Sequence, residues 1–181
     1  MQSFNIVPQE STPVQIYLGL GSNIGDRYYN LEWALRALSQ KMGMGQVSSV
    51  YDTAPMGNTA QPRFLNLVCE ATTSLPPLEF LAFIKEIETD MGRKPGPPNS
   101  PRPIDIDILF YDNQIISTPE LIIPHPRLTE RAFMLVPLAE ITPDFIHPVV
   151  GKKIRQILKA LNVGMDEVIK WDNKRGETCT K

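Results

Sequence analysis

The chain has 181 residues, of which 42% are hydrophobic and 21% are charged, and its net charge is −2. This length suits one domain, and the composition is typical of a soluble globular protein. The weak net charge argues against bulk electrostatic binding to nucleic acid or to an anionic membrane. No apolar run approaches the roughly 20 residues that a membrane helix needs.

The two ends of the chain carry little sign of a packed fold. Residues 1–13 lack the basic start and apolar segment of a signal peptide, and the stretch from Asn162 onward is polar. We therefore expect one domain over residues 14–162, with terminal extensions at 1–13 and 163–181. Cys69 and Cys179 have no CxxC partner, which predicts neither a disulfide framework nor a zinc site. A cytoplasmic location is the default expectation.

Apolar patterning from residue 14 onward predicts an α+β fold. Alternating or continuous apolar runs predict strands over residues 14–20, 44–53, 64–73 and 104–110. The first strand is expected to end in a turn at residues 19–23. Helical spacing predicts one helix from an Asp26 N-cap to about Lys41, and a second from a Ser74 cap to Gly92. The order β-α-β-β-α-β is the ferredoxin-like arrangement, an antiparallel sheet with helices on one face.

The residue pattern in the C-terminal third of the chain predicts a short hairpin and two more helices. The hairpin pairs residues 114–116 with 121–123, and the helices are expected near Glu130–Ala139 and Gly151–Leu161. Upstream, the proline-rich segment 94–103 must be a loop, since proline is excluded from helix interiors and central strands. A lid over a site and a simple connector are equally good interpretations of this loop.

The segment that follows this loop alternates apolar and acidic residues. On a strand, Asp105 and Asp107 share one face, opposite Ile104, Ile106 and Ile108. Two adjacent carboxylates repel each other unless a cation lies between them. Mg²⁺ binds such oxygens and usually keeps waters and substrate phosphates as well. From this strand alone, a solvated strand face and a metal site are equally good interpretations.

The glycine-rich nucleotide motifs do not fit the sequence. Gly19-Leu20-Gly21 follows a strand, but the third glycine, Gly25, comes one position late, and there is no GxxxxGK[ST]. Cationic side chains would then have to bind any phosphate groups. The candidates are Arg93, Arg102, Arg131 and His125. Each of them is also a plausible surface or structural residue on its own.

Two aromatic residues flank this region. Phe64 and Phe133 are ordinary core material taken singly, but a pair of rings can stack on both faces of a flat heterocycle. Asn66 lies two residues after Phe64 on the same strand face, so its amide could hydrogen-bond the edge of such a ring.

Taken in order, these motifs resemble those of the 6-hydroxymethyl-7,8-dihydropterin pyrophosphokinases, folate-pathway enzymes that move pyrophosphate from ATP to a pterin alcohol. The resemblance extends over residues 15–148. The matching motifs are Gly19-Leu-Gly-Ser-Asn23, Tyr51-Asp-Thr-Ala-Pro-Met-Gly57, Phe64-Leu-Asn66, Ile87-Glu88 with Gly92-Arg93, Arg102-Pro-Ile-Asp-Ile-Asp-Ile108, Pro124-His125 and Arg131-Ala-Phe133-Met-Leu.

The resemblance implies a role for each of these residues. Asp105 and Asp107 would be the ligands of two Mg²⁺ ions, and with Arg93 and Arg102 they would form the catalytic group. The residues that would bind ATP are Glu88, Arg93, Arg102, His125 and Arg131. Those that would bind the pterin are Thr53, Ala54, Pro55, Met56, Phe64, Asn66 and Phe133. The resemblance implies a monomer or weak dimer, with neither nucleic acid nor membrane as a partner.

The sequence departs from the family pattern just before Arg102. Relatives often have an aromatic residue and a glycine there, where this chain has Asn99 and Ser100, and the loop is shorter and richer in proline. We therefore expect a stiffer lid. Two other functions stay open at this point: a nucleotidyl- or glycosyltransferase with an Asp-x-Asp site, and a non-catalytic ferredoxin-like binding module. The first is disfavoured because Gly21-Ser22 lies far upstream of the acidic pair.

Overall fold

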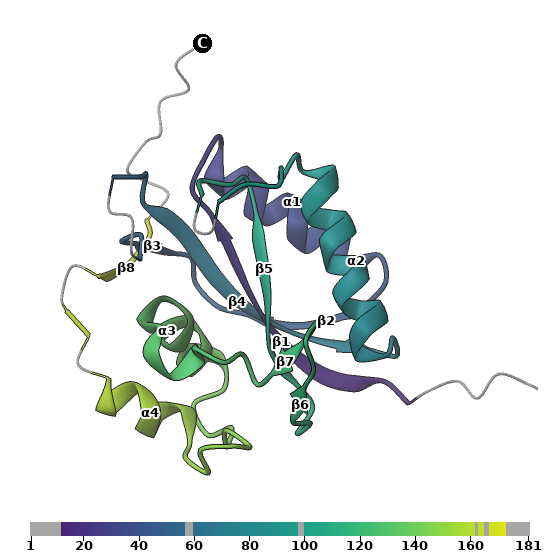
Figure 1. Cartoon of the computed structure of the whole chain (residues 1–181). Coiled ribbons are helices and arrows are strands. Elements are labelled where there is room, and N and C mark those ends of the chain that lie inside the picture. Colours follow the sequence, from purple (N-terminus) through teal and green to yellow (C-terminus); the bar gives the residue numbers. More distant parts are fainter. Residues whose placement is uncertain (1–11, 57–59, 98–99, 162, 165–166, 173–181) are drawn as a thin grey trace, which may run out of the picture.

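A six-stranded antiparallel sheet forms the centre of the molecule in the computed structural model (Figure 1), which describes residues 12–56, 60–97, 100–161, 163–164 and 167–172. Its strands are β1 (Val14–Ser22), β2 (Gly43–Val47), β3 (Tyr51–Thr53), β4 (Phe64–Thr73), β5 (Asp105–Tyr111) and β8 (Val168–Lys170). The strand order is β5-β1-β4-β3-β8, and β2 also pairs with β4. The predicted antiparallel α+β fold is confirmed.

Helices cover both faces of this sheet. On the first face lie α1 (Arg27–Ser39) and α2 (Pro77–Asp90), and on the second lie α3 (Ala132–Ile141) and α4 (Ile154–Ala160). Strands β1, β4 and β5 contribute side chains to the cores on both faces of the sheet, because successive side chains of a strand point to opposite faces. On β1, Leu18 packs with α1 and α2 in the first core, while Tyr17 packs with α3 in the second.

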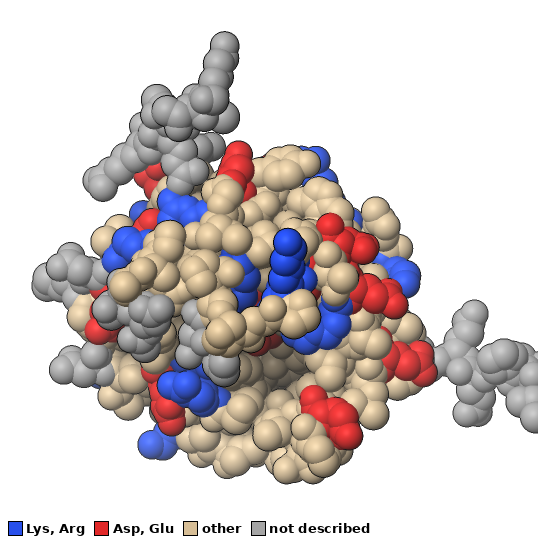
Figure 2. Space-filling view, turned by 45° about the horizontal axis from the view of Figure 1, so that its top comes forward, with Lys and Arg blue, Asp and Glu red and all other residues tan. Residues whose placement is uncertain are grey.

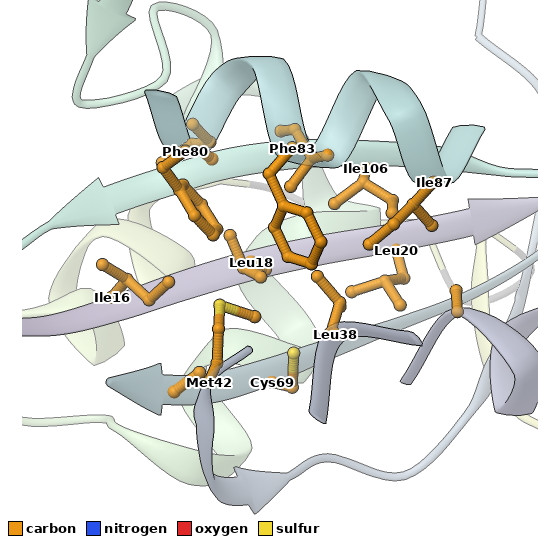
Figure 3. Packing of buried hydrophobic residues seen from close by; sticks show 14 of the residues in the cluster. Ile16, Leu18, Leu20, Leu38, Met42, Cys69, Phe80, Phe83, Ile87 and Ile106 are labelled. Atoms are coloured by element: carbon orange, nitrogen blue, oxygen red, sulfur yellow. The ribbon is translucent and has the colours of Figure 1, made fainter. Parts of the chain in front are cut away.

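The first core is the larger of the two. Phe80, Phe83 and Ile87 of α2 lie over the apolar face of β1 and over Ile106 of β5 (Figure 3). Ile106 is the residue between the two aspartates, and it is 1% exposed. Burying such a side chain contributes roughly 1.5–3 kcal/mol, so packing fixes the register of β5 and turns Asp105 and Asp107 away from α1 and α2, toward the α3 side of the sheet.

Several predicted elements differ in their details. The strand expected over residues 44–53 is two strands, β2 and β3. They are separated at Ser48, whose hydroxyl accepts the Val68 N–H at 3.0 Å in place of a backbone carbonyl. The turn expected at residues 19–23 was wrong for its first four residues, because β1 continues through Ser22 and pairs with β4 and β5.

The predicted Ser74 cap was also wrong. Helix α2 begins at Pro77, with Pro76 in the N-cap position and no side-chain cap hydrogen bond. The hairpin is formed by β6 (Ile116–Ser117) and β7 (Ile122–Ile123). A 3₁₀ turn, Leu128–Glu130, precedes α3, so this helix begins two residues later than expected, and α4 is shorter at both ends than predicted.

The C-terminal segment adds a strand that the sequence pattern did not predict. Strand β8 pairs with β3, and the Trp171 N–H donates to the Val50 carbonyl at 2.9 Å. The Trp171 ring also stacks on Tyr28, with 4.9 Å between the ring centroids. Residues 167–171 of the expected terminal extension therefore contact the sheet. None of the helices in the described residues is long and apolar enough to cross a membrane.

Candidate active site

A cavity lies on the α3 side of the sheet, where β1, β4 and β5 meet the loop after β3 and the start of α3. Its walls include ten of the predicted site residues: Thr53, Ala54, Met56, Phe64, Asn66, Arg102, Asp105, Asp107, Arg131 and Phe133. Figure 2 shows a hollow on one face of the molecule, with basic side chains gathered around it. Pro55 lines an adjoining hollow that shares Ala54, Met56 and Phe133.

The two aspartates lie side by side on β5, as predicted. Asp105 is opposite Gly21 of the neighbouring strand β1, and Asp107 is opposite Gly19 of the same strand. Both glycines line the cavity. At Gly21 a methyl group would overlap the Oδ1 atom of Asn66, so glycine is needed there for the close approach of β1 to the Asn66 amide.

The two aspartates differ in their charged partners. Asp105 is fully engaged: its Oδ1 lies 2.6 Å from Arg93 Nη1, and its Oδ2 lies 2.6 Å from Arg102 Nη2. Among the described residues, the ion-pair partner of Asp107 is the more distant Arg131, whose Nη1 lies 3.8 Å from Oδ2. Burial, and then the charge of Asp105, raise the pKa of Asp107 to about 6, although Arg131 and nearby cations act in the opposite direction. The structure thus contains an under-neutralised carboxylate at the floor of the cavity.

Two of the arginines have unused hydrogen-bond donors. In the described part of the chain, Arg102 Nε and Arg131 Nε are the buried side-chain polar atoms that have no hydrogen-bond partner. Buried donors in folded proteins are nearly always paired, and an unpaired one costs roughly 1–3 kcal/mol. Both arginines line the cavity, so their geometry suits an anionic ligand that accepts these hydrogen bonds.

Glu88 lies behind the charged group and does not line the cavity. It is 1% exposed, and its Oε1 accepts the Ile106 N–H at 2.8 Å. The same oxygen contacts Arg93, and Oε2 lies 2.8 Å from Lys85 Nζ. Glu88 therefore connects the end of α2 to the backbone between the two aspartates, and it holds Arg93 in place beside Asp105.

His125 also stands one contact away from the cavity. Its backbone N–H donates to Leu109 at 3.0 Å, which fixes the loop against β5. The ring Nδ1 accepts the Arg127 N–H at 3.2 Å, and Nε2 lies 3.3 Å from Arg131 Nη1. Burial, followed by the charge of Arg131, lowers the pKa of His125 to about 4. The ring is therefore uncharged at neutral pH.

The other half of the cavity is a less charged slot. Asn66 Nδ2 donates to Thr53 Oγ1 at 2.6 Å, and both residues are buried. Phe64 comes from β4 and Phe133 from α3, so the two rings belong to different walls of the cavity. The guanidinium carbon of Arg102 lies 5.6 Å from the centroid of the Phe64 ring, and Arg131 lies at the same distance from Phe133. The slot thus adjoins the charged half directly.

Residues 17–143 match the family model for 7,8-dihydro-6-hydroxymethylpterin-pyrophosphokinase. The chain belongs to this family. It is 43% identical to a 2-amino-4-hydroxy-6-hydroxymethyldihydropteridine pyrophosphokinase of Aquifex aeolicus, over 78% of this chain and 88% of the relative. With the Bacillus subtilis protein of the same name, the identity is 46% over 69% of this chain and 76% of the relative.

Other relatives of the family are much longer. A folic acid synthesis protein of Dictyostelium discoideum is 44% identical over 74% of this chain, which spans only 20% of that relative. Among solved structures, an HPPK-DHPS crystal structure from Plasmodium falciparum matches with a TM-score of 0.70 at 20% identity. The match covers 88% of this chain and 47% of the Plasmodium falciparum chain. This likeness shows that the fold is shared.

Three further residues belong to the site although the sequence did not single them out. Asn23 is 1% exposed; its Oδ1 accepts the Arg102 N–H at 2.8 Å, and its amide donates to Gln61 at 3.1 Å. Gln61 and Arg127 line the cavity. Two features of the sequence could have pointed to these residues: Asn23 ends a family motif, and Arg127 lies two residues after His125. Nothing in the local pattern marks Gln61.

Proposed function

We propose that the chain carries out the reaction for which its family is named. It would transfer pyrophosphate from ATP to the hydroxymethyl group of 6-hydroxymethyl-7,8-dihydropterin, giving AMP and the pterin diphosphate for folate biosynthesis. One observation carries this proposal: the carboxylate–arginine group and the aromatic slot open into the same cavity. A phosphate donor at one end then meets a flat acceptor at the other, and holding two reactants together is a large part of catalysis.

The charged half suits ATP and magnesium. Asp105 and Asp107 offer hard oxygen donors on one strand face. Burial, and then the charge of Asp105, raise the pKa of Asp107, and a bound cation would offset both. Among the described residues no group of three or more His, Cys, Asp or Glu could hold a metal. Phosphates and water would thus supply the remaining ligands. Two bound Mg²⁺ ions would offset the charge of the transferring phosphates.

The arginines would exchange partners when ATP binds. Arg93 and Arg102 are now held by Asp105, and a cation on this carboxylate would compete with them and turn their donors toward phosphate oxygens. The unpaired Nε–H groups of Arg102 and Arg131 are further donors for the same oxygens. The neutral His125 ring has one acceptor nitrogen and one N–H, so it would offer a single donor to a phosphate oxygen. Glu88 contributes by fixing Arg93.

The slot would bind the pterin. Phe64 and Phe133 would stack on its two faces, since aromatic faces attract flat rings. Thr53, Asn66 and the backbone of residues 54–56 would hydrogen-bond its polar edge. The hydroxymethyl oxygen would then attack the β-phosphorus of ATP and release its proton to water. The bond from that phosphorus to the oxygen bridging to the α-phosphate would break, and AMP would leave with this oxygen. Such transfers depend mainly on positioning and charge neutralisation.

The rest of the proposal concerns the environment of the site. We propose a monomer or weak dimer in the cytoplasm, acting without nucleic acid or membrane. The segment 94–103 would be a stiff lid; of the two residues that depart from the family pattern, Asn99 lies outside the described residues and Ser100 donates to the Pro97 carbonyl at 2.7 Å. Similar closure rates for the wild type and a glycine-substituted segment would contradict this stiffness.

The test is AMP formation that depends on the pterin. Wild type with Mg²⁺, ATP and 6-hydroxymethyl-7,8-dihydropterin should release AMP, and Asp107→Ala should abolish this while its circular dichroism spectrum stays native. Full activity of Asp107→Ala would overturn the metal assignment. Calorimetry with a non-hydrolysable ATP analogue, with and without Mg²⁺ and pterin, distinguishes the enzyme from a binding module, for which binding would not depend on the metal.

A further inference from the structure

Helix α3 forms one wall of the slot and also carries a charged residue at its far end. Arg131 stands at its N-cap and Phe133 in its first turn, both on the cavity. The helix packs on the sheet through buried apolar side chains that include Met134, Leu135 and Leu138. These contacts are non-directional, so they hold α3 on the sheet without fixing its position by hydrogen bonds.

Glu140, in the last turn of α3, supplies directional contacts. Its Oε2 accepts the Ser49 N–H at 3.0 Å and the Tyr51 O–H at 2.9 Å. Its Oε1 accepts the Ser49 hydroxyl at 2.7 Å and lies 3.8 Å from Lys170 Nζ of β8. Hydrogen bonds to a charged group are about twice as strong as neutral ones.

These contacts lead directly to the opposite wall of the slot. Tyr51 is the first residue of β3, whose last residue is Thr53, and Tyr51 is in register with Asn66 on β4 and with Lys170 on β8. Thr53 and Asn66 are hydrogen-bonded to each other and line the cavity, as does Ala54, which follows β3. Glu140 thus joins the helix that bears Phe133 to the strand that bears Thr53.

We propose that Glu140 is a positioning residue that sets the spacing between α3 and β3, and thereby the affinity of the slot for a planar pterin. The inference rests on the proposed function, because it takes the pterin as the occupant of the slot. Glu140 does not line the cavity, so it acts on the ligand only through Phe133 and Thr53.

The ionisation of the contacts agrees with this geometry. Burial alone would raise the pKa of Glu140, but the hydrogen bonds from Ser49 and Tyr51, together with Lys170, lower it. Burial and the bond to Glu140 raise the pKa of Tyr51 to about 12. The carboxylate and the phenol therefore keep their present roles as acceptor and donor across the neutral pH range.

The test compares Glu140→Ala with a matched surface carboxylate. Asp144 lies just beyond α3. It pairs with Lys153, the N-cap residue of α4, at 2.9 Å and with Arg155 in α4 at 3.0 Å. Asp144→Asn therefore removes a carboxylate with two ion pairs at a position away from the slot. Steady-state kinetics of both variants and of the wild type should be measured for the pterin and for ATP, with melting temperatures and direct pterin binding by calorimetry.

We expect Glu140→Ala to raise KM and Kd for the pterin about tenfold, the cost of one charge-assisted hydrogen bond. KM for ATP and kcat should stay within about twofold, because a uniformly weakened ground state and transition state leave kcat unchanged. Tyr51→Phe should raise KM for the pterin by a smaller factor. It should add nothing in the Glu140→Ala background, since the two residues share one interaction. Asp144→Asn should lower the melting temperature without changing either KM.

The possible outcomes separate the inference from the proposed function. An active wild type whose pterin KM and Kd are unchanged by Glu140→Ala overturns the inference alone, since a lower melting temperature by itself means a merely structural role. An equal rise in the KM for ATP also overturns it, because the effect would not be confined to the slot. A wild type that neither binds the pterin nor forms AMP overturns the proposed function, and the inference with it.

Discussion

The two halves of the cavity are built in opposite ways. In the slot, Asn66 and Thr53 satisfy each other and Gly21 leaves the space that the Asn66 amide needs. In the charged half, two arginine Nε–H groups have no partner in the described part of the chain, and the pKa of Asp107 is raised. The slot is complete without a ligand, whereas the charged half lowers stability until phosphates and cations balance it. Functional sites often carry such a cost.

The largest expected effect comes from Asp107→Asn, which tests the charged half. The variant should lose about a thousandfold in kcat/KM, as expected when an electrostatic group at the reacting centre is removed. Without ligands it should nevertheless melt at the same or a higher temperature at pH 7–8. The wild-type carboxylate has a folded pKa of about 6, above the ordinary value of 3.8, so its ionisation opposes folding at pH 7–8.

This stability difference has a defined pH dependence. The advantage of Asp107→Asn should shrink as the pH falls from 7 toward 4, where the wild-type carboxyl becomes protonated in the folded state. Differential scanning calorimetry in magnesium-free buffer measures it. A ligand-free variant that melts well below the wild type at pH 8 would mean that Asp107 stabilises the fold, and that the charged half does not lower stability.

The second largest effect is expected at Glu88, the buried residue that supports the charged half. Glu88→Ala leaves the Ile106 N–H unpaired and removes the partner of Arg93 and Lys85. Breaking such a buried pair costs about 3 kcal/mol, measured as the free energy of unfolding in urea. The exposed Glu86 on the same helix is the matched control, and its replacement by Ala should cost about 0.5 kcal/mol or less. Equal losses would refute the supporting role of Glu88.

Gly21→Ala tests whether the slot is preformed. The added methyl group would push the Asn66 amide away from Thr53, so KM for the pterin should rise about tenfold, the value of one lost hydrogen bond to a polar ligand edge. KM for ATP should change little. If the pterin KM stayed at the wild-type value, the Asn66–Thr53 pair would not be part of the pterin site.

The smallest effect concerns Glu140 and the acid limb of stability. The pKa of Glu140 is lowered in the folded protein from its ordinary value of 4.5. Its contribution to the free energy of unfolding is therefore complete above pH 4.5 and is lost as the pH falls below that value. The free energy of unfolding of the wild type should exceed that of Glu140→Gln by about 1 kcal/mol at pH 7. This difference should disappear below pH 4.5. Urea titrations at both pH values measure it, and a constant difference would contradict the hydrogen-bonded carboxylate.

The sequence predicted most of the fold because the signals were local. The alternation in residues 104–110 placed Asp105 and Asp107 on one face, and burial of Ile106 enforces it. Strand β8 was missed because its three residues become a strand by pairing with β3 and not through a pattern of their own. Ser48 divides a predicted strand through a hydrogen bond to Val68, a contact that no spacing rule reveals.

The site was predicted as a set of residue types, but not as an arrangement in space. The motifs pointed to Arg93, Arg102 and His125, yet only tertiary structure shows that Asp105 holds both arginines. Glu88 is on a helix, where a glutamate is usually exposed, so its burial under β5 could not be foreseen. Gln61 and Glu140 belong to no motif, and they reach their partners only through the fold.

Product analysis tests the central claim most directly. ³¹P NMR of a reaction with ATP, Mg²⁺ and 6-hydroxymethyl-7,8-dihydropterin distinguishes transfer of a pyrophosphate from transfer of a single phosphate. The account predicts AMP and the pterin diphosphate in equal amounts, and neither of them when the pterin is omitted. Formation of ADP with a pterin monophosphate, or of AMP without the pterin, would contradict it.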